Sequence, residues 1–347
     1  MIAELDTASA KAYGEQDAAE LIEAAQTALQ RITQGSTQAD DWEGSDVGFS
    51  ALVQRMDDMA AGRIKSTAVS TGLRDLDDRL NGGLHEGELI VIGARPRMGK
   101  SALALSIADH IARARICCGF FSMEMPKSQV YARRLSMAAS IHLQRIKIPQ
   151  RLQDRDWERI TREVQDLRET PLYVNDQGGL TITQVRAKAK MLHRRKGMRV
   201  LFIDYLGLMA ATDPKIPRAY QIEEITKGLK QLAKELRISI VLLVQISRKV
   251  EERVDQLPML SDLKDSGSIE QDADVILLLH REWAAKAGLM EEWKDYAKVR
   301  VAKMRDGEPG DVDLRYIGEN TLFLDWPADH QPPSNRARTS ARTGGGL

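Results

Sequence analysis

The sequence predicts an α/β fold in which helices cover both faces of a mostly parallel central sheet. Two observations carry this prediction. Short apolar runs, such as 88–94 and 199–205, alternate with longer segments in which apolar residues recur at helical spacing. These runs are too continuously apolar for strands with one solvated face, so we expect a sheet that is buried on both sides. A short helical region precedes this fold.

Composition limits the kinds of function that the chain can have. The 347 residues include 50 Lys and Arg and 50 Asp and Glu, so the formal net charge is zero. A nucleic-acid site must therefore be a local patch, because the whole chain supplies no cationic field. No apolar stretch is long enough to cross a membrane and the N-terminus lacks a signal peptide, so we expect no membrane partner and a cytoplasmic location.

The first 65 residues read as an N-terminal segment. Within it, apolar residues repeat along one stripe over about 17–33, which predicts a helix. A polar, Gly- and Ser-containing stretch at 34–46 is typical of a linker, and a second helix is expected over 49–62. Residues 66–327 are expected to form one domain, and 328–347, which lack an apolar pattern, a disordered tail.

The central domain is predicted strand by strand. The strands are expected at 88–94, 117–123, 172–176, 199–205, 238–245, 273–281, 296–305 and in the stretches DLRYI and TLFLDW. Helical segments are expected at 101–115, over most of 127–167, and at 182–197 and 221–237. The adjacent Cys117 and Cys118 fall on a strand, where we expect reduced core residues. The basic run 193–199 is interpreted as a solvated helix end.

The stretch GARPRMGKS, residues 93–101, predicts a phosphate-binding loop between a strand and a helix. Gly99 lets the backbone approach phosphate oxygens, and amide groups at the start of a helix point toward them. Lys100 can reach the β- and γ-phosphates, and the Ser101 hydroxyl can bind Mg²⁺. The spacing departs from the usual motif, because its first position falls on Ala94 and Gly93 comes one residue early. ATP and Mg²⁺ are the expected ligands.

Three polar side chains come at the ends of other predicted strands. Asp204 follows the apolar run LFI, where a carboxylate can hold Mg²⁺, usually through water. Glu124 ends the strand FSM at the sheet edge where α/β proteins bind ligands, so it is the candidate base that activates water. Gln245 ends IVLLV and is interpreted as a sensor of the γ-phosphate or of DNA, with a turn residue as the open alternative.

Two later segments carry candidate phosphate contacts. Residues 247–274 have charge and little periodicity between two buried strands, which is typical of a functional loop. In this loop Lys264, Ser266 and Gly267 could meet phosphates through an ammonium, a hydroxyl and a backbone amide. Lys303 and Arg305 alternate along a predicted strand and would matter only if they reach a neighbour's γ-phosphate.

Taken together, these stretches resemble the C-terminal motor domain of the DnaB-type replicative DNA helicases, which has a RecA-like fold. The resemblance runs from about Ser66 to Trp326 and is carried by the segments STGLRDLDDRLNGGLHEGELIVIGARPRMGKSALAL, FSMEM, LFIDYLGLM, QISRKVEER, LSDLKDSGSIEQDAD and AKMRDGEPG. The early Gly93 is itself a mark of this family, whose loop commonly reads G-A-R-P-x-M-G-K-[ST].

The resemblance implies a ring, usually hexameric, that hydrolyses ATP between subunits, translocates on single-stranded DNA and unwinds forked duplexes. It implies catalytic or metal-binding roles for Glu124, Lys100, Ser101, Asp204 and Gln245, and trans-acting roles for Lys303 and Arg305. Nucleotide contacts are implied for Arg97, Met98, Gly99, Lys100, Ser101, Ala102 and Arg133. Single-stranded DNA contacts are implied for Lys264, Asp265 and Gly267. A helicase loader and a primase are further partners that the family suggests.

Some features depart from the family. Lys264 and Asp265 stand where Arg and Glu are usual, and Gly207 stands where a Gln is usual. The family's helical collar domain is expected to be missing here, with 17–33 matching its linker helix. This suggests two alternative functions. The chain could be a collar-less phage or mobile-element subunit that joins or inhibits a host ring. It could also be a RecA-like DNA-dependent ATPase without unwinding activity.

Overall fold

The computed structural model describes residues 42, 44–64, 66–211, 213, 215–253, 256–263, 266–285 and 291–333. The chain divides into two compact units between Ser66 and Thr67. In the described part of the first unit, helix α3 (Ser45–Ala60) has no buried residue. The helix predicted at 17–33 lies outside the described residues, as do residues 334–347 of the predicted tail.

The second unit is built on one sheet, which has nine strands among the described residues, in the order β3-β2-β4-β5-β1-β6-β7-β8-β9. Strands β1 to β6 run parallel to one another, and β7, β8 and β9 extend the sheet as antiparallel strands. The bounds are β1 Leu89–Ala94, β2 Cys118–Ser122, β3 Leu172–Asn175, β4 Val200–Asp204, β5 Ser239–Gln245, β6 Val275–His280, β7 Tyr296–Met304, β8 Gly310–Ile317 and β9 Leu322–Asp325. The predicted, mostly parallel sheet is confirmed.

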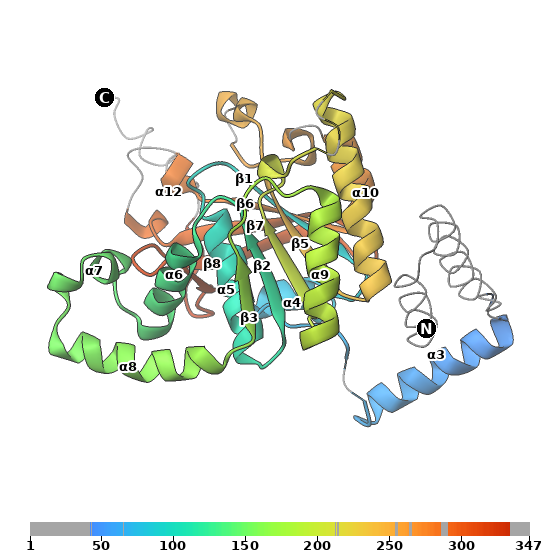
Figure 1. Cartoon of the computed structure of the whole chain (residues 1–347), viewed down its shortest axis with the longest axis horizontal. Coiled ribbons are helices and arrows are strands. Elements are labelled where there is room, and N and C mark those ends of the chain that lie inside the picture. The colour runs from blue at the N-terminus through green and yellow to red at the C-terminus, as the bar shows by residue number, and fades with distance from the viewer. Residues whose placement is uncertain are drawn as a thin grey trace, which may run out of the picture. The chain divides into compact units, whose positions relative to one another are not determined.

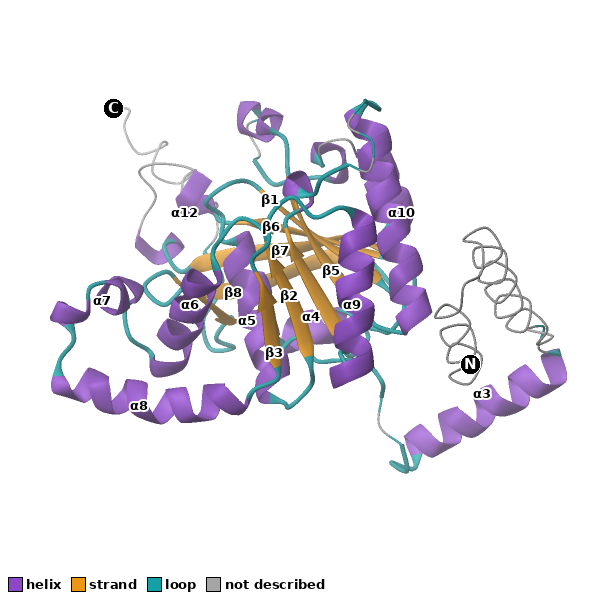
Figure 2. Cartoon of the chain, in the orientation of Figure 1, coloured by secondary structure: helices purple, strands orange, loops and turns teal. Residues whose placement is uncertain are grey.

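Helices connect the strands and flank the sheet (Figures 1 and 2). Their bounds are α4 Arg74–Arg79, α5 Lys100–Arg113, α6 Lys127–Ala139, α7 Leu143–Lys147, α8 Asp154–Glu169, α9 Ile182–Lys196, α10 Arg218–Leu236, α11 Ser266–Asp272 and α12 Glu282–Ala285. Helices α9 and α10 pack side by side, and α5 belongs to a separate apolar cluster. Among the described residues, no helix is long and apolar enough to cross a bilayer.

Two apolar cores fill the space between the sheet and its helices, one on each face. Alternate residues of each strand belong to different cores, because successive strand side chains point to opposite faces of the sheet. In β2, Phe120 packs in the core that contains α5, and Phe121 packs in the core that contains α9 and α10. In β4, Phe202 and Leu201 divide in the same way. The sheet is therefore buried on both sides, as its continuous apolar runs predict.

One predicted segment differs from the structure, and a second largely agrees with it. The sequence predicts a loop over 247–274, whereas the last part of this segment forms helix α11. The helix escapes the sequence pattern because it has only seven residues, with Ile269 as its fully buried apolar residue. In the basic run at 193–199, residues 194–197 are exposed as predicted, and the partly exposed Arg199 donates to the Thr67 carbonyl and to Glu86.

Candidate functional site

The carboxyl ends of the parallel strands bring the predicted site residues to one edge of the sheet. Ala94 of β1 pairs with Gln245 of β5, and Ser122 of β2 pairs with Asp204 of β4. A cavity of about 350 Å³ opens at this edge. The predicted residues that line it are Arg97, Gly99, Lys100, Ser101, Ala102, Glu124, Arg133 and Gln245. The arrangement follows from topology, because parallel strands end together where ligands bind in open α/β sheets.

The phosphate loop has the backbone shape that an anion site requires. Gly99 has a φ of +95° at the N-cap of α5, a conformation that favours glycine. A Cβ there would lie 3.2 Å from the Phe323 ring, so space as well as conformation selects glycine. The loop therefore directs the first amides of α5 at the cavity, as phosphate binding requires. Met98 departs from the prediction, since its buried side chain packs in the core and does not line the cavity.

Lys100 has surroundings with opposite effects on the pKa of its amine. Burial lowers the pKa of its amine, while the carboxylates of Asp204 and Glu124 act in the opposite direction. Its Nζ lies 3.7 Å from Asp204 Oδ1 and 4.2 Å from the centroid of the Tyr205 ring. A largely buried ammonium whose neighbours are one distant carboxylate and an aromatic ring can bind a further anionic group. A triphosphate supplies such charge.

Asp204 is fully buried, and neither carboxylate oxygen has a hydrogen-bond partner in the described part of the chain. In the described part of the chain this buried carboxylate has only the Lys100 ammonium at 3.7 Å and no hydrogen bond, which is costly, and a ligand at this position would offset that cost. Its oxygens and the Ser101 hydroxyl are the hard donors that Mg²⁺ prefers. The residues present therefore fit a magnesium ion at this edge.

Glu124 and Gln245 are both exposed at the cavity. Glu124 lies just beyond β2 and Gln245 is the last residue of β5, so each can approach a phosphate or a water from a different strand. A solvated carboxylate can accept a proton from water, and a solvated amide can donate to a phosphate oxygen. These positions fit the predicted roles and leave both side chains accessible.

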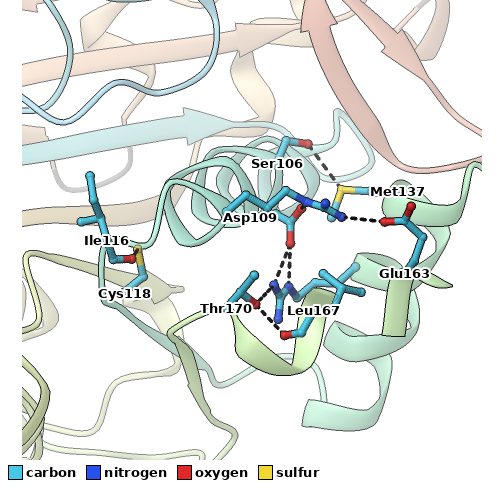
Figure 3. A network of polar contacts seen from close by, with 10 residues as sticks. Ser106, Asp109, Ile116, Cys118, Met137, Glu163, Leu167 and Thr170 are labelled. Carbon is cyan, nitrogen blue, oxygen red and sulfur yellow. Dashed lines mark hydrogen bonds and ion pairs between the residues drawn. The ribbon is translucent and has the colours of Figure 1, made fainter. Parts of the chain in front are cut away.

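Arg133 reaches the cavity from α6, and a buried polar network holds that helix. The next residue, Arg134, is buried and donates from Nε to Asp109 of α5 over 2.8 Å. Asp109 also accepts from Arg113, and Arg134 Nη2 donates to Thr170 over 2.9 Å. Figure 3 shows this network, which joins the helix after the phosphate loop to the helix that carries Arg133. The network therefore fixes the position of Arg133 relative to the phosphate loop.

Four residues that line the cavity are not among the predicted site residues: Ala94, Arg95, Pro96 and Tyr205. Tyr205 follows Asp204 and places its ring against Lys100. Gly207 explains how this is possible, since a Cβ there would lie 2.5 Å from the Tyr205 ring. In the sequence, the signal for this position of Tyr205 is Gly207, which stands where the family usually has Gln. Arg95 also lines the cavity and forms an ion pair with Glu251, and only its place in the loop could have pointed to it.

Lys303 and Arg305 lie away from this cavity. Lys303 pairs with Ile276 near the start of β6, whereas Leu279, near the end of β6, is the residue that pairs with Ala94. They are thus at the opposite edge of the sheet. Lys303 donates to the carbonyls of Glu270 and Ala273, and Arg305 Nη1 lies 3.1 Å from Asp274 Oδ1. Neither side chain can serve the phosphate loop of its own chain.

The predicted DNA contacts are described only in part. Lys264 and Asp265 lie outside the described residues, and the exposed Gly267 lies in α11. Leu263, which precedes them, forms an isolated bridge with Ile246 just beyond the end of β5. Ile246 and Leu263 therefore lie at the same edge of the sheet as the cavity.

Comparisons with known proteins agree on one family. The family model of the DnaB-like helicase C terminal domain matches residues 68–325. The chain is 37% identical over 319 residues to the replicative DNA helicase DnaB of Leifsonia xyli subsp. xyli, covering 91% of this chain and 68% of that protein. It is 36% identical over 281 residues to the DnaB of Rickettsia typhi, covering 74% of this chain and 56% of that protein.

Solved structures give the same answer. One of them, an ATPase domain, superposes with a TM-score of 0.76 at 32% identity, covering 82% of this chain and all of that one. A DnaB-like replicative helicase, described together with its interactions with primase, superposes with a TM-score of 0.74 at 30% identity. That match covers 94% of this chain and 76% of the other. The RecA-like fold expected from the sequence is thereby confirmed.

Proposed function

The chain belongs to the DnaB-like helicase family, and on this premise we propose that it is an ATP-dependent DNA helicase of the replicative type. It would translocate on single-stranded DNA as a ring, with six subunits as the family suggests, and separate forked duplexes. The observation that carries the proposal is the cavity at the strand ends, where Lys100, Glu124 and Gln245 converge beside the buried Asp204. The chain covers 56% of the Rickettsia typhi relative, so the activity of that whole protein is a proposal for this chain.

The cavity supports a division of labour in ATP hydrolysis. Lys100 and the amides of the α5 N-terminus bind the β- and γ-phosphates. Ser101 and Asp204 hold Mg²⁺, which neutralises phosphate charge when bound. Glu124 accepts a proton from the attacking water, and Gln245 donates to the γ-phosphate. Arg133 lies beside the adenine, and Arg97, Gly99 and Ala102 complete the nucleotide contacts through the loop.

Lys303 and Arg305 are proposed to act across a subunit interface. Their location at the opposite sheet edge supports this, because they can reach a nucleotide only in a neighbouring copy. Lys264, Asp265 and Gly267 are proposed to hold the DNA backbone in the ring channel. Six copies of a modestly charged loop can form a local cationic funnel even though the chain has no net charge.

The remaining assignments follow from the family. Residues 66–327 form the motor domain in this proposal, and residues 17–33, which are predicted to be helical, are proposed to dock on the next subunit. A helicase loader and a primase are proposed partners, and the cytosol is the proposed compartment. A hexamer and Mg²⁺ dependence are part of the same proposal.

The proposal is tested by ATP hydrolysis with and without single-stranded DNA. We expect turnover that rises with DNA and requires Mg²⁺, and that is lost in Lys100→Ala. The matched control is Lys190→Ala, which removes an exposed lysine paired with Glu235 on the α9–α10 face. A wild-type chain that binds neither ATP nor DNA would contradict the proposal.

A further inference from the structure

Arg95 has an environment that the phosphate-loop motif does not explain. It follows the last residue of β1 and lines the nucleotide cavity, and its side chain is only 11% exposed. Its Nε and Nη1 atoms are buried and have no hydrogen-bond partner among the described residues. A buried guanidinium with unused donors gains free energy from any acceptor that reaches it. In this cavity, a nucleotide phosphate is the acceptor that the geometry offers.

The guanidinium has one strong partner, and that partner comes from a distant segment. Arg95 Nη2 donates to Glu251 Oε1 in a close ion pair. Glu251 lies in the short 3-10 helix η3 (Arg248–Glu252), which follows β5 and the proposed phosphate sensor Gln245. The Glu251 side chain is 60% exposed, so it can leave the pair for solvent at little cost. The phosphate loop and this segment are thus joined through a bond that can exchange.

The segment that carries Glu251 is tied into a compact unit ending at the proposed DNA contacts. Its base is closed by the Ile246–Leu263 bridge and by a bond from Ser247 N to the Asp262 carbonyl. Arg253 bridges the segment by donating to Asp262 and to the Leu257 carbonyl. A displacement of Glu251 would therefore be passed to the described residues around Arg253 and Asp262, and the proposed DNA contacts Lys264 and Asp265 come next in the sequence.

Gly93 places this unit on the strand that carries the phosphate loop. A Cβ at Gly93 would lie 3.0 Å from Leu263 and 3.3 Å from Ile246. The two bridge residues therefore pack directly against the backbone of β1, two residues before Arg95. β1 and the residue that follows it thus contact the segment at Gly93, through the bond from Ile246 N to the Ala94 carbonyl, and through the Arg95–Glu251 pair.

We propose that Arg95 exchanges between Glu251 and the nucleotide phosphates, and that this exchange couples nucleotide binding to the position of the DNA-binding segment. The inference rests on the proposed function. When nucleotide is bound, the triphosphate outcompetes a single carboxylate, because it offers more charge and more acceptor oxygens. Glu251 is then released, so segment 246–263 loses the ion pair with Arg95 and keeps its contacts with β1 at Gly93 and Ala94. By linkage, DNA that favours the released segment tightens nucleotide binding by the same factor.

The experiment measures nucleotide and DNA affinity separately on the full chain. A fluorescent non-hydrolysable ATP analogue with Mg²⁺ gives the nucleotide dissociation constant without DNA. A labelled oligo-dT gives the DNA dissociation constant with and without saturating analogue, and the ratio of the two is the coupling factor. The variants are Arg95→Ala, Arg95→Lys, Glu251→Gln and the double variant Arg95→Ala/Glu251→Gln. Glu252→Gln is the matched control, since this exposed neighbour lies on the same short helix.

Arg95→Ala should weaken analogue binding on the order of tenfold, as the loss of a charge-assisted contact does. Arg95→Lys should recover part of this loss, which separates a lost contact from a distorted loop. Glu251→Gln should tighten analogue binding and move the coupling factor toward one, whereas Glu252→Gln should change neither. Adding Glu251→Gln to Arg95→Ala should have no further effect.

Unchanged analogue affinity and coupling in Glu251→Gln would overturn the inference, as would additive effects in the double variant. A wild-type coupling factor of one would overturn it too, although the proposed function would survive if the analogue and DNA both bind. Failure of the wild-type chain to bind the analogue would remove both proposals together.

Discussion

Two buried aspartates lie at opposite edges of the same sheet, and their surroundings differ. Asp274, which precedes β6, is 3% exposed and accepts from Leu89 N, Lys230 Nζ and Arg305 Nη1. Asp204, at the end of β4, is fully buried and neither oxygen has a hydrogen-bond partner in the described part of the chain. The ammonium of Lys100 stands 3.7 Å away from it.

We interpret the difference as one between a structural carboxylate, Asp274, and the carboxylate that we propose to bind Mg²⁺, Asp204. Asp274 joins the starts of β1 and β6 to α10 and has its charge balanced within the fold. Among the described residues Asp204 has only the Lys100 ammonium at 3.7 Å and no hydrogen bond, which folding alone would not favour. Unsatisfied buried charge is found at the cavity edge, where Arg95 also has unused donors. We therefore expect changes at the cavity edge to affect ATP hydrolysis and changes at the opposite edge to affect stability, with Arg305 as the exception.

Replacing Arg305 should have the largest effect on ATP hydrolysis. The residue lies at the edge of the sheet opposite the cavity, yet it is proposed to act on the ATP of a neighbouring subunit. Arg305→Ala should lower ATP turnover roughly 10³-fold, as loss of an arginine finger does. ATP binding should change little, since the residue acts on a neighbouring subunit. Stability should change little as well, because the side chain is 58% exposed.

Turnover and analogue binding on the same preparation check this prediction. The control is Arg315→Ala, which removes an exposed ion pair between Arg315 of β8 and Asp295. Equal loss of binding and turnover would contradict the trans assignment, and would make Arg305 a structural partner of Asp274 alone.

Asp204→Asn tests the carboxylate at the cavity edge. Turnover should fall by roughly 10²-fold or more, because Mg²⁺ loses a charged partner. The free energy of unfolding should change by about 1 kcal/mol, less than at Asp274, since among the described residues the carboxylate makes no hydrogen bond and its ion pair with Lys100 spans 3.7 Å. Steady-state hydrolysis over a Mg²⁺ titration, together with chemical denaturation, checks both parts. A large loss of stability with intact turnover would reverse the assignment.

Asp274→Asn makes the complementary change at the opposite edge. It leaves the buried Lys230 without its carboxylate, so unfolding should become easier by about 3 kcal/mol. Analogue affinity should be unchanged, because the cavity lies at the other end of the strands. Denaturant unfolding and analogue titration check this. An unchanged midpoint would show that the network at this edge contributes nothing to stability.

Gly93→Ala has the smallest expected effect. The added methyl would meet Leu278 at 2.9 Å and Leu263 at 3.0 Å, so overpacking should cost about 1–2 kcal/mol of stability. Because Leu263 adjoins the proposed DNA contacts, oligo-dT affinity should fall while analogue affinity without DNA changes less. Gly178→Ala, where a Cβ would lie 3.9 Å from the Met123 carbonyl oxygen, is the control for glycine replacement in general. Identical DNA affinity in Gly93→Ala and wild type would contradict the packing argument.

Much of the fold could be predicted from the sequence, because buried parallel strands leave continuous apolar runs that end in polar residues. The same logic brings Glu124 and Gln245 to one cavity and Asp204 to its edge, although their catalytic roles remain predictions. Helix α11 is not predicted because seven residues are too few to show a helical periodicity. Met98 is assigned to the nucleotide because of its place in the motif, whereas the structure buries it in the core.

Other features depend on contacts between distant segments, which no local pattern encodes. The Arg95–Glu251 pair joins two loops that follow different strands, and the balance of charge at Asp274 comes from three separate elements. Gly207 is visible as a departure from the family, but its consequence, the Tyr205 ring against Lys100, emerges only from the folded chain.

The most direct test of the account is ATP-dependent unwinding of a forked DNA duplex by the purified chain, with Lys100→Ala beside it. The account predicts strand separation by the wild-type chain that requires ATP and is absent from the variant. ATP hydrolysis stimulated by DNA without strand separation would contradict the helicase assignment and would favour a RecA-like ATPase. Inhibition of a full-length DnaB on mixing, with no unwinding by the chain itself, would favour a subunit that acts on another ring.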